Sequence, residues 1–165
     1  MFSKNRGMLL ESIINRTLHY YENNNLAFIE KQIVPIKFKG VDNESNLQSA
    51  HIYRKSTVDY IGCFRGKFVA FEAKTTESNV IEKANFKKHQ INYLQKIHNV
   101  NGVVFYLLFF GCANEFYFLD FADFLKFEGK AIHYNEIKKT GFKLDLLFPG
   151  IIDFLPIIEN KYFRN

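Results

Sequence analysis

Two carboxylates and one lysine stand at a spacing that suits metal-dependent cleavage of a phosphodiester bond. They are Asp59, then Glu72, and then Lys74 in an E-x-K arrangement. Carboxylate oxygens are the hard ligands that Mg²⁺ prefers, and a lysine ammonium can offset the negative charge that develops on a phosphoryl group. The pattern is short and common, and it also fits a surface hairpin with an incidental salt bridge. Its meaning therefore depends on where the chain places the three side chains.

The segment 56–74 predicts a β-hairpin that brings these side chains together. Arg65-Gly66 provides the turn, because glycine readily takes the positive φ that two-residue loops favour. With that loop Asp59 lies opposite Glu72, whereas a three-residue loop with a bulge would undo the pairing. Strand side chains alternate between the two faces of a sheet. We expect one face to carry Thr57, Asp59, Glu72 and Lys74, and the core-facing side to carry Val58, Tyr60, Val69, Phe71 and Ala73.

This register makes a physical demand on the two carboxylates. Directly opposed residues have Cβ atoms only about 4.5–5.5 Å apart, where like charges destabilise a sheet. Two such groups need a cation or a shared proton. Lys74 lies one same-face step from Glu72 and can neutralise part of the charge, whereas Mg²⁺ bound by Asp59 and Glu72 would neutralise more. We expect one or two Mg²⁺ ions to activate a water molecule and to polarise the scissile phosphate.

A polar residue also falls on the apolar stripe of the helix expected near residues 85–99. Gln90 lies four positions from both Phe86 and Leu94, and residues at that spacing share one helix face. A core-facing glutamine needs partners for its amide group. Two interpretations stay open, a hydrogen bond to neighbouring backbone or a position over the two carboxylates in contact with the metal or the DNA.

The charge distribution favours a nucleic-acid partner. The chain has 165 residues, a formal net charge of +5 and a pI of about 9.1, and the positive excess lies within residues 51–100. It fits either a solvated basic face or a surface that faces phosphates, where clustered cations gain affinity by releasing counterions. The candidate DNA-backbone contacts are Lys37, Lys39, Arg54, Lys55, Lys87 and Lys88.

The sequence also argues against a membrane or secreted protein and against a zinc site. The chain has no apolar run long enough to span a bilayer and no apolar signal core near its start, so we expect a cytoplasmic protein without a membrane partner. Cys63 and Cys112 form neither a C-x-x-C motif nor a Cys/His cluster, and we therefore expect no zinc site.

The elements around the hairpin predict a single α/β domain over residues 1–165. The polar segment 31–55 suits a projecting β-ribbon or an ordered loop better than a core element. The final apolar stretch, 150–163, suits the core, a dimer contact or both. Besides the hairpin and the helix near 85–99, periodicity predicts a helix at 5–22, strands at 26–32, 102–110 and 115–120, and a short helix at 121–129.

An acid and an E-x-K on a hairpin, followed by a helix with an inward glutamine, resemble the PD-(D/E)xK nuclease superfamily. Five segments in order narrow this resemblance to the RecU family of bacterial Holliday-junction resolvases, over nearly the whole chain. They are N-R-G-M-x-L-E at 5–11, S-T-V-D-Y at 56–60, F-E-A-K-T at 71–75, H-Q-I at 89–91 and I-D-F-L-P-I-I-E at 152–159.

Three features depart from the family pattern. Val58 stands where the family usually has a second threonine, and Thr75 stands where it has an acid. Both positions flank the expected ligands, so we expect metal binding to persist. The longer basic N-terminal arm of many members is absent, and we expect DNA affinity or substrate choice to differ for that reason.

The resemblance implies a restriction-endonuclease-like core, a mixed central β-sheet flanked by helices, with a stalk-like insertion at about 31–55 that enters the junction. It implies a homodimeric, Mg²⁺-dependent endonuclease, with Mn²⁺ as a substitute, that nicks four-way junctions symmetrically in recombination and repair. A recombinase or a branch-migration helicase would be a further partner. By analogy Lys74 stabilises the transition state, and the metal ligands are Thr57, Asp59, Glu72 and Gln90.

Two alternatives to a junction-specific enzyme stay open. One is a related repair or restriction-type nuclease that acts on ordinary duplex DNA. The other is a junction-binding module without catalysis, against which the intact Asp59, Glu72 and Lys74 argue.

Overall fold

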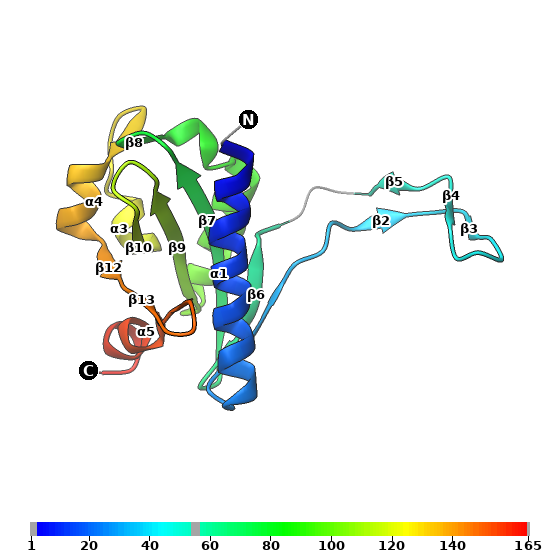
Figure 1. Ribbon diagram of the computed structural model, residues 1–165, viewed down its shortest axis with the longest axis horizontal. Coiled ribbons are helices and arrows are strands. Elements are labelled where there is room, and N and C mark those ends of the chain that lie inside the picture. The colour runs from blue at the N-terminus through cyan, green and yellow to red at the C-terminus, as the bar shows by residue number, and fades with distance from the viewer. Residues whose placement is uncertain (1–2, 54–56, 165) are drawn as a thin grey trace.

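The computed structural model describes residues 3–53 and 57–164. Its centre is a six-stranded sheet in the order β1-β6-β7-β9-β10-β12 (Figure 1). Strands β7 and β9 run parallel, and the other neighbouring pairs of this sheet are antiparallel. The predicted mixed sheet is therefore confirmed. Its strands are β1 (Phe28–Lys31), β6 (Tyr60–Phe64), β7 (Lys67–Thr76), β9 (Val103–Phe110), β10 (Glu115–Asp120) and β12 (Phe142–Leu144).

Helices cover both faces of the sheet, and each covered face has its own hydrophobic core. One core packs α1 and α5 against Phe71 and Phe105 of the central strands. The other packs α2, α3 and α4 against Val104 and Tyr106. A strand covered on both faces needs apolar side chains at consecutive positions, and all eight residues of β9 are buried. The helices are α1 (Ser3–Asn23), α2 (Lys88–Asn99), α3 (Phe121–Phe124), α4 (Tyr134–Thr140) and α5 (Leu155–Tyr162).

Helix α1 is fixed to the rest of the fold by buried polar contacts as well as by packing. The Thr17 hydroxyl accepts a hydrogen bond from the N–H of Ile152. The Tyr21 hydroxyl donates to Asp153 and accepts from the N–H of Phe154. Buried polar groups destabilise a fold unless they are paired in this way. These contacts hold the C-terminal segment against α1 and fix the position of that helix beside β7.

A narrow β-ribbon (residues 32–53) projects from the sheet between β1 and β6 (Figure 1). Most of its side chains are exposed. Asp42 closes the tip by accepting two backbone N–H groups of the turn. At the base, the N–H of Gln32 donates to the carbonyl oxygen of Asp59 at 2.7 Å. The ribbon strands pair as β2 (Ile36–Lys37) with β5 (His51–Ile52) and β3 (Gly40–Val41) with β4 (Leu47–Gln48).

The short elements differ from the sequence prediction. The helix expected over 121–129 ends at Phe124, and α2 begins at Lys88 after a separate 3-10 turn. Strands of two or three residues are too short to show a periodic pattern. None of the described helices has the length and apolarity required to cross a bilayer. The elements that were not predicted are β8 (Val80–Glu82), η1 (Lys83–Asn85), β11 (Ala131–His133), α4, β12, β13 (Leu146–Leu147), β14 (Ile151–Ile152) and α5.

Candidate active site

The hairpin of β6 and β7 adopts the predicted register. Arg65 and Gly66 form its turn with φ values of 48° and 79°, the positive values that two-residue hairpin loops need. Phe71 is buried in the core beneath α1, so the next residue, Glu72, projects from the opposite face. The paired residues are Tyr60 with Phe71, Ile61 with Ala70, Gly62 with Val69, Cys63 with Phe68 and Phe64 with Lys67.

The start of β6 differs from the prediction. The strand begins at Tyr60 and a bend precedes it, so Asp59 is not paired with Glu72 within the strand ladder. Val58 was expected on the core face beside Tyr60, but it is buried in the other core with Ala70. That prediction is wrong, because the chain changes direction before the strand begins.

Asp59 and Glu72 meet through backbone hydrogen bonds instead. The N–H of Asp59 donates to Oε1 of Glu72 at 3.0 Å. In return the N–H of Ala73, the residue after Glu72, donates to Oδ2 of Asp59 at 3.2 Å. The two bonds are reciprocal, and they orient both carboxylates from the rigid backbone of a sheet. The expected proximity of the two acids is present, although the geometry that produces it is different.

Glu72 is the buried acid of the site. Its side chain is 0% exposed, and its Oε2 accepts a hydrogen bond from Nζ of Lys74 at 2.7 Å. Burial, followed by the charge of Asp59, raises the pKa of Glu72 to about 8, whereas Lys74 lowers it. A buried carboxylate needs compensating positive charge. Because one lysine cannot compensate two adjacent acids, the site favours binding of a further cation.

Gln90 lies over the same face of the sheet. Its Oε1 accepts a hydrogen bond from Nζ of Lys74 at 3.3 Å, so the structure favours the position over the carboxylates. Phe86 and Leu94 are buried in the core beneath α2, as the apolar stripe predicts. Helix α2 belongs to the crossover between the parallel strands β7 and β9, and such a crossover lies on one face of the sheet. The connection therefore places Gln90 above Glu72.

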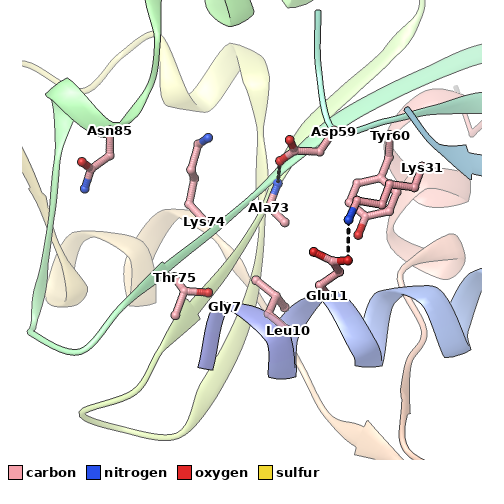
Figure 2. Close-up of a pocket in the computed structure, with 10 residues that line it drawn as sticks. All are labelled: Gly7, Leu10, Glu11, Lys31, Asp59, Tyr60, Ala73, Lys74, Thr75 and Asn85. Atoms are coloured by element: carbon pink, nitrogen blue, oxygen red, sulfur yellow. Dashed lines mark hydrogen bonds and ion pairs between the residues drawn. The ribbon is translucent and has the colours of Figure 1, made fainter. Parts of the chain in front are cut away.

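A cavity of about 450 Å³ opens beside these residues, between α1, the end of β7 and η1 (Figure 2). Glu11 and Lys31 form an ion pair on one side of it, and Asn85 lies across from them. Sequence reasoning gave these three residues no role, and the one signal for Glu11 was its place in the N-terminal motif. The lining residues are Gly7, Leu10, Glu11, Lys31, Asp59, Tyr60, Ala73, Lys74, Thr75 and Asn85.

The donors available for a divalent cation are hard oxygens. Asp59 and Glu72 supply carboxylates and Gln90 supplies an amide oxygen, while Thr57 is half-buried in the bend before β6. Across residues 3–53 and 57–164, no group of three or more His, Cys, Asp or Glu is placed to hold a metal. A cation here would be held by two carboxylates, neutral oxygens and water. Mg²⁺ is bound in this sparse way because it keeps several of its own waters.

The predicted DNA-backbone contacts fall into separate groups. One pair of exposed lysines lies at the start of α2, a few residues before Gln90. Another pair is exposed on the ribbon, far from the carboxylates (Figure 1). The first pair is Lys87 and Lys88, the second is Lys37 and Lys39, and Arg54 and Lys55 lie outside the described residues.

Known proteins resemble this chain over nearly all of its length. Residues 5–160 match the model of the family RecU, described as Recombination protein U. The chain is 39% identical over 160 residues to Holliday junction resolvase RecU of Mycoplasmopsis pulmonis, which covers 97% of this chain and 98% of that protein. It is 33% identical over 173 residues to Holliday junction resolvase RecU of a Geobacillus species, with coverage of 98% and 86%.

A solved structure is also similar. It is the structure of Hjc from Archaeoglobus fulgidus, a Holliday junction resolvase, with a TM-score of 0.48 and 12% sequence identity over 79% of this chain and 93% of that one.

The family match includes both ends of the motif series, from the segment 5–11 to the segment 152–159. It also includes the hairpin and the helix that together hold Asp59, Glu72 and Gln90. The chain therefore belongs to the RecU family, recombination protein U.

Proposed function

We propose that this chain is a Holliday-junction resolvase, an endonuclease that nicks four-way DNA junctions symmetrically in recombination and repair. Relatives at 39% and 33% identity carry the name of that activity. The observation that carries the proposal is the buried Glu72 carboxylate, held between the backbone of Asp59 and Lys74 beside an open cavity. A surface that only contacts DNA phosphates needs no buried carboxylate. A hydrolytic active site, in contrast, uses buried acids of this kind.

Mg²⁺ is the proposed cofactor, as one or two ions per site, and Mn²⁺ is a substitute. When bound, the ion supplies an activated water and neutralises charge at the scissile phosphate. Asp59 and Glu72 hold it through carboxylate oxygens, and Thr57 and Gln90 hold it through neutral oxygens. The hydrogen bonds from the N–H groups of Asp59 and Ala73 support the assignment, because they fix the orientation of both acids before any ligand arrives.

Lys74 is the proposed transition-state stabiliser. Its Nζ is shared between Glu72 and Gln90, and the side chain lines the cavity (Figure 2). Gln90 is a neutral acceptor, so it orients the ammonium group without cancelling its charge. With Glu72 neutralised by a bound cation, the charge of Lys74 is available to the phosphoryl oxygens as negative charge develops on them.

Two surfaces are proposed to contact the DNA. Lysines at the start of α2 hold the backbone beside the active site, and the ribbon enters the junction as the stalk. Together they govern the salt dependence of binding, because each phosphate contact releases counterions. The α2 contacts are Lys87 and Lys88, the ribbon contacts are Lys37 and Lys39, and Arg54 and Lys55 are proposed as further contacts from the sequence.

The working form is proposed to be a homodimer. A four-way junction needs two equivalent cuts, and a two-fold dimer presents one active site to each of the two strands. A recombinase or a branch-migration helicase directs the dimer to its substrate, and the location is cytoplasmic.

The test is cleavage of a labelled four-way junction by the purified chain in Mg²⁺, beside Asp59→Asn and Glu72→Gln. We expect paired symmetric nicks from the native chain, and junction binding without nicking from both variants. A native chain that binds junctions but does not nick them would instead be a binding module. Equal cleavage of linear duplex would identify a general nuclease, and nicking that survives either substitution would overturn the site assignment.

A further inference from the structure

One buried side-chain oxygen in the described part of the chain has no hydrogen-bond partner, and it is the hydroxyl of Tyr106. Tyr106 lies within the apolar strand β9 and is 1% exposed. An unpaired buried hydroxyl lowers the stability of a fold. A phenylalanine would fill the same space without that cost, so the hydroxyl points to a partner that belongs to the working site.

Strand pairing places Tyr106 beside Glu72. The two residues are partners in the parallel ladder of β7 and β9, so their side chains leave the sheet side by side on one face. The rings of Phe86 and Phe124 hold the phenol, with centroids 5.0 Å and 4.6 Å from its own. Burial, followed by the charge of Glu72, raises the pKa of Tyr106, which is further evidence that the two groups are close.

The carboxylate of Glu72 can accept more hydrogen bonds than those it receives from Asp59 and Lys74. Its Oε1 accepts from the N–H of Asp59 and its Oε2 from Nζ of Lys74, whereas an ionised carboxylate offers about four acceptor positions. Both donors belong to residues that line the cavity (Figure 2). Tyr106 approaches from the neighbouring strand instead. It can therefore contact Glu72 without occupying the side that faces a ligand.

We propose that Tyr106 is a positioning residue whose hydroxyl donates, through one bound water, to the carboxylate of Glu72. This bond keeps Glu72 oriented while Lys74 serves the substrate phosphate. Tyr106 itself contacts neither the DNA nor the reacting atoms. The inference rests on the proposed function, and it assigns the affinity of the metal site in part to a residue of the apolar core. Donors that orient a ligand in this way are typically worth about 10–100-fold in metal affinity or activity.

The test compares Tyr106→Phe with the native full-length chain by titration with Mn²⁺, following the free ion by electron paramagnetic resonance without DNA. We expect the dissociation constant to rise about tenfold. We also expect nicking to require correspondingly more Mn²⁺ than in the native chain. The urea unfolding midpoint of the metal-free chain should not fall, because the hydroxyl that is removed has no direct hydrogen bond to another protein group among the described residues.

The matched control is Tyr162→Phe. The Tyr162 hydroxyl bonds to Asp120 and to the carbonyl oxygen of Val104, so its removal should lower the unfolding midpoint and leave Mn²⁺ affinity unchanged. If Tyr106→Phe behaves like this control, or keeps native Mn²⁺ affinity while the native chain binds and nicks, the inference is overturned and the proposed function stands. If the native chain neither binds Mn²⁺ nor nicks junctions, the proposed function is overturned and the inference with it.

Discussion

The β6–β7 hairpin and the ribbon are both antiparallel two-stranded units, but they are stabilised in different ways. The hairpin lies inside the six-stranded sheet, and Phe71 stacks between Tyr60 and Phe105 with centroids 4.7 Å away on each side. The ribbon strands pair with one another, and Phe38 and Ile52 at its surface are 49% and 66% exposed. An isolated two-stranded hairpin is only marginally stable in water.

This difference in support suits the hairpin to catalysis and the ribbon to DNA contact. A hydrolytic site must hold its groups to a fraction of an ångström, and strands packed on both faces provide that precision. Contacts to a DNA backbone tolerate a less rigid support, because phosphates attract lysines over several ångströms. The acids lie on the rigid unit and exposed lysines lie on the other. We therefore expect substitutions in the two units to have separable effects.

The largest expected effect is on stability. Phe71→Ala leaves a cavity between two aromatic rings at the centre of the sheet, and we expect the free energy of unfolding to fall by about 3–5 kcal/mol. Phe38→Ala on the ribbon should change it by less than about 0.5 kcal/mol. Urea denaturation of both variants measures the contrast. A ribbon variant as destabilised as the sheet variant would show that the ribbon packs on a surface outside this protomer.

The second effect is on the chemical step. Lys74→Ala removes the ammonium group shared by Glu72 and Gln90, and we expect single-turnover nicking to slow by about 10²–10³-fold. Junction affinity, measured by gel shift in Ca²⁺, should change little. The result would contradict the proposed role of Lys74 if nicking continued at the native rate.

The third effect is on DNA affinity. Replacing both Lys37 and Lys39 with alanine should lower the salt dependence of junction binding, by roughly 0.9 in log–log slope for each phosphate that the ribbon no longer neutralises. The nicking rate of bound junction should stay native, because the active site is unchanged. Replacing both Lys138 and Lys139 on α4 with alanine is the charge-matched control, since both are exposed on another surface. An equal decrease of slope in the control would assign the effect to net charge rather than to the ribbon.

The fourth effect is the pH dependence of stability without metal. The pKa of Glu72 is about 8 in the folded chain, compared with an ordinary value of 4.5. The folded chain thus keeps a proton that the unfolded chain has released. This contribution to stability is complete below about pH 4.5 and is lost as the pH rises through about 8.

Urea midpoints measured across that pH range test this expectation. Glu72→Gln should flatten the decline, whereas Glu44→Gln on the ribbon should leave it in place. Mg²⁺ should oppose the decline, because binding requires the ionised carboxylate. A decline of native size in Glu72→Gln would mean that another group is responsible.

The sequence predicted the hairpin and its register because the turn signal is local. The two-residue turn at Arg65-Gly66 requires positive φ at both positions. The alternation of side chains between the two faces then assigns each strand residue to a face. The position of Val58 could not be predicted in this way, because the bend before β6 depends on tertiary contacts. Helix periodicity put Gln90 on the sheet-facing side of its helix, where it contacts Lys74, but left its partner open between the backbone and the carboxylate site.

Other residues of the site carried no local signal. Glu11 and Asn85 reach the cavity from α1 and η1, so only the folded chain shows that they are neighbours. Tyr106 lies within a continuous apolar run, where one hydroxyl does not alter the pattern. Its importance emerges only when the strand order aligns it with Glu72.

The hydrogen bond at the base of the ribbon has a mechanical consequence. The outgoing leg begins at Gln32, whose N–H holds the carbonyl oxygen of Asp59 at 2.7 Å. Lys31, the preceding residue, pairs with Tyr60, the residue after Asp59. The outgoing leg of the ribbon is therefore tied at its base to the backbone of Asp59, a proposed metal ligand, so a shift of the ribbon base would move Asp59 as well. The base of the ribbon and the candidate active site are thus attached to the same short stretch of backbone, at Asp59 and Tyr60.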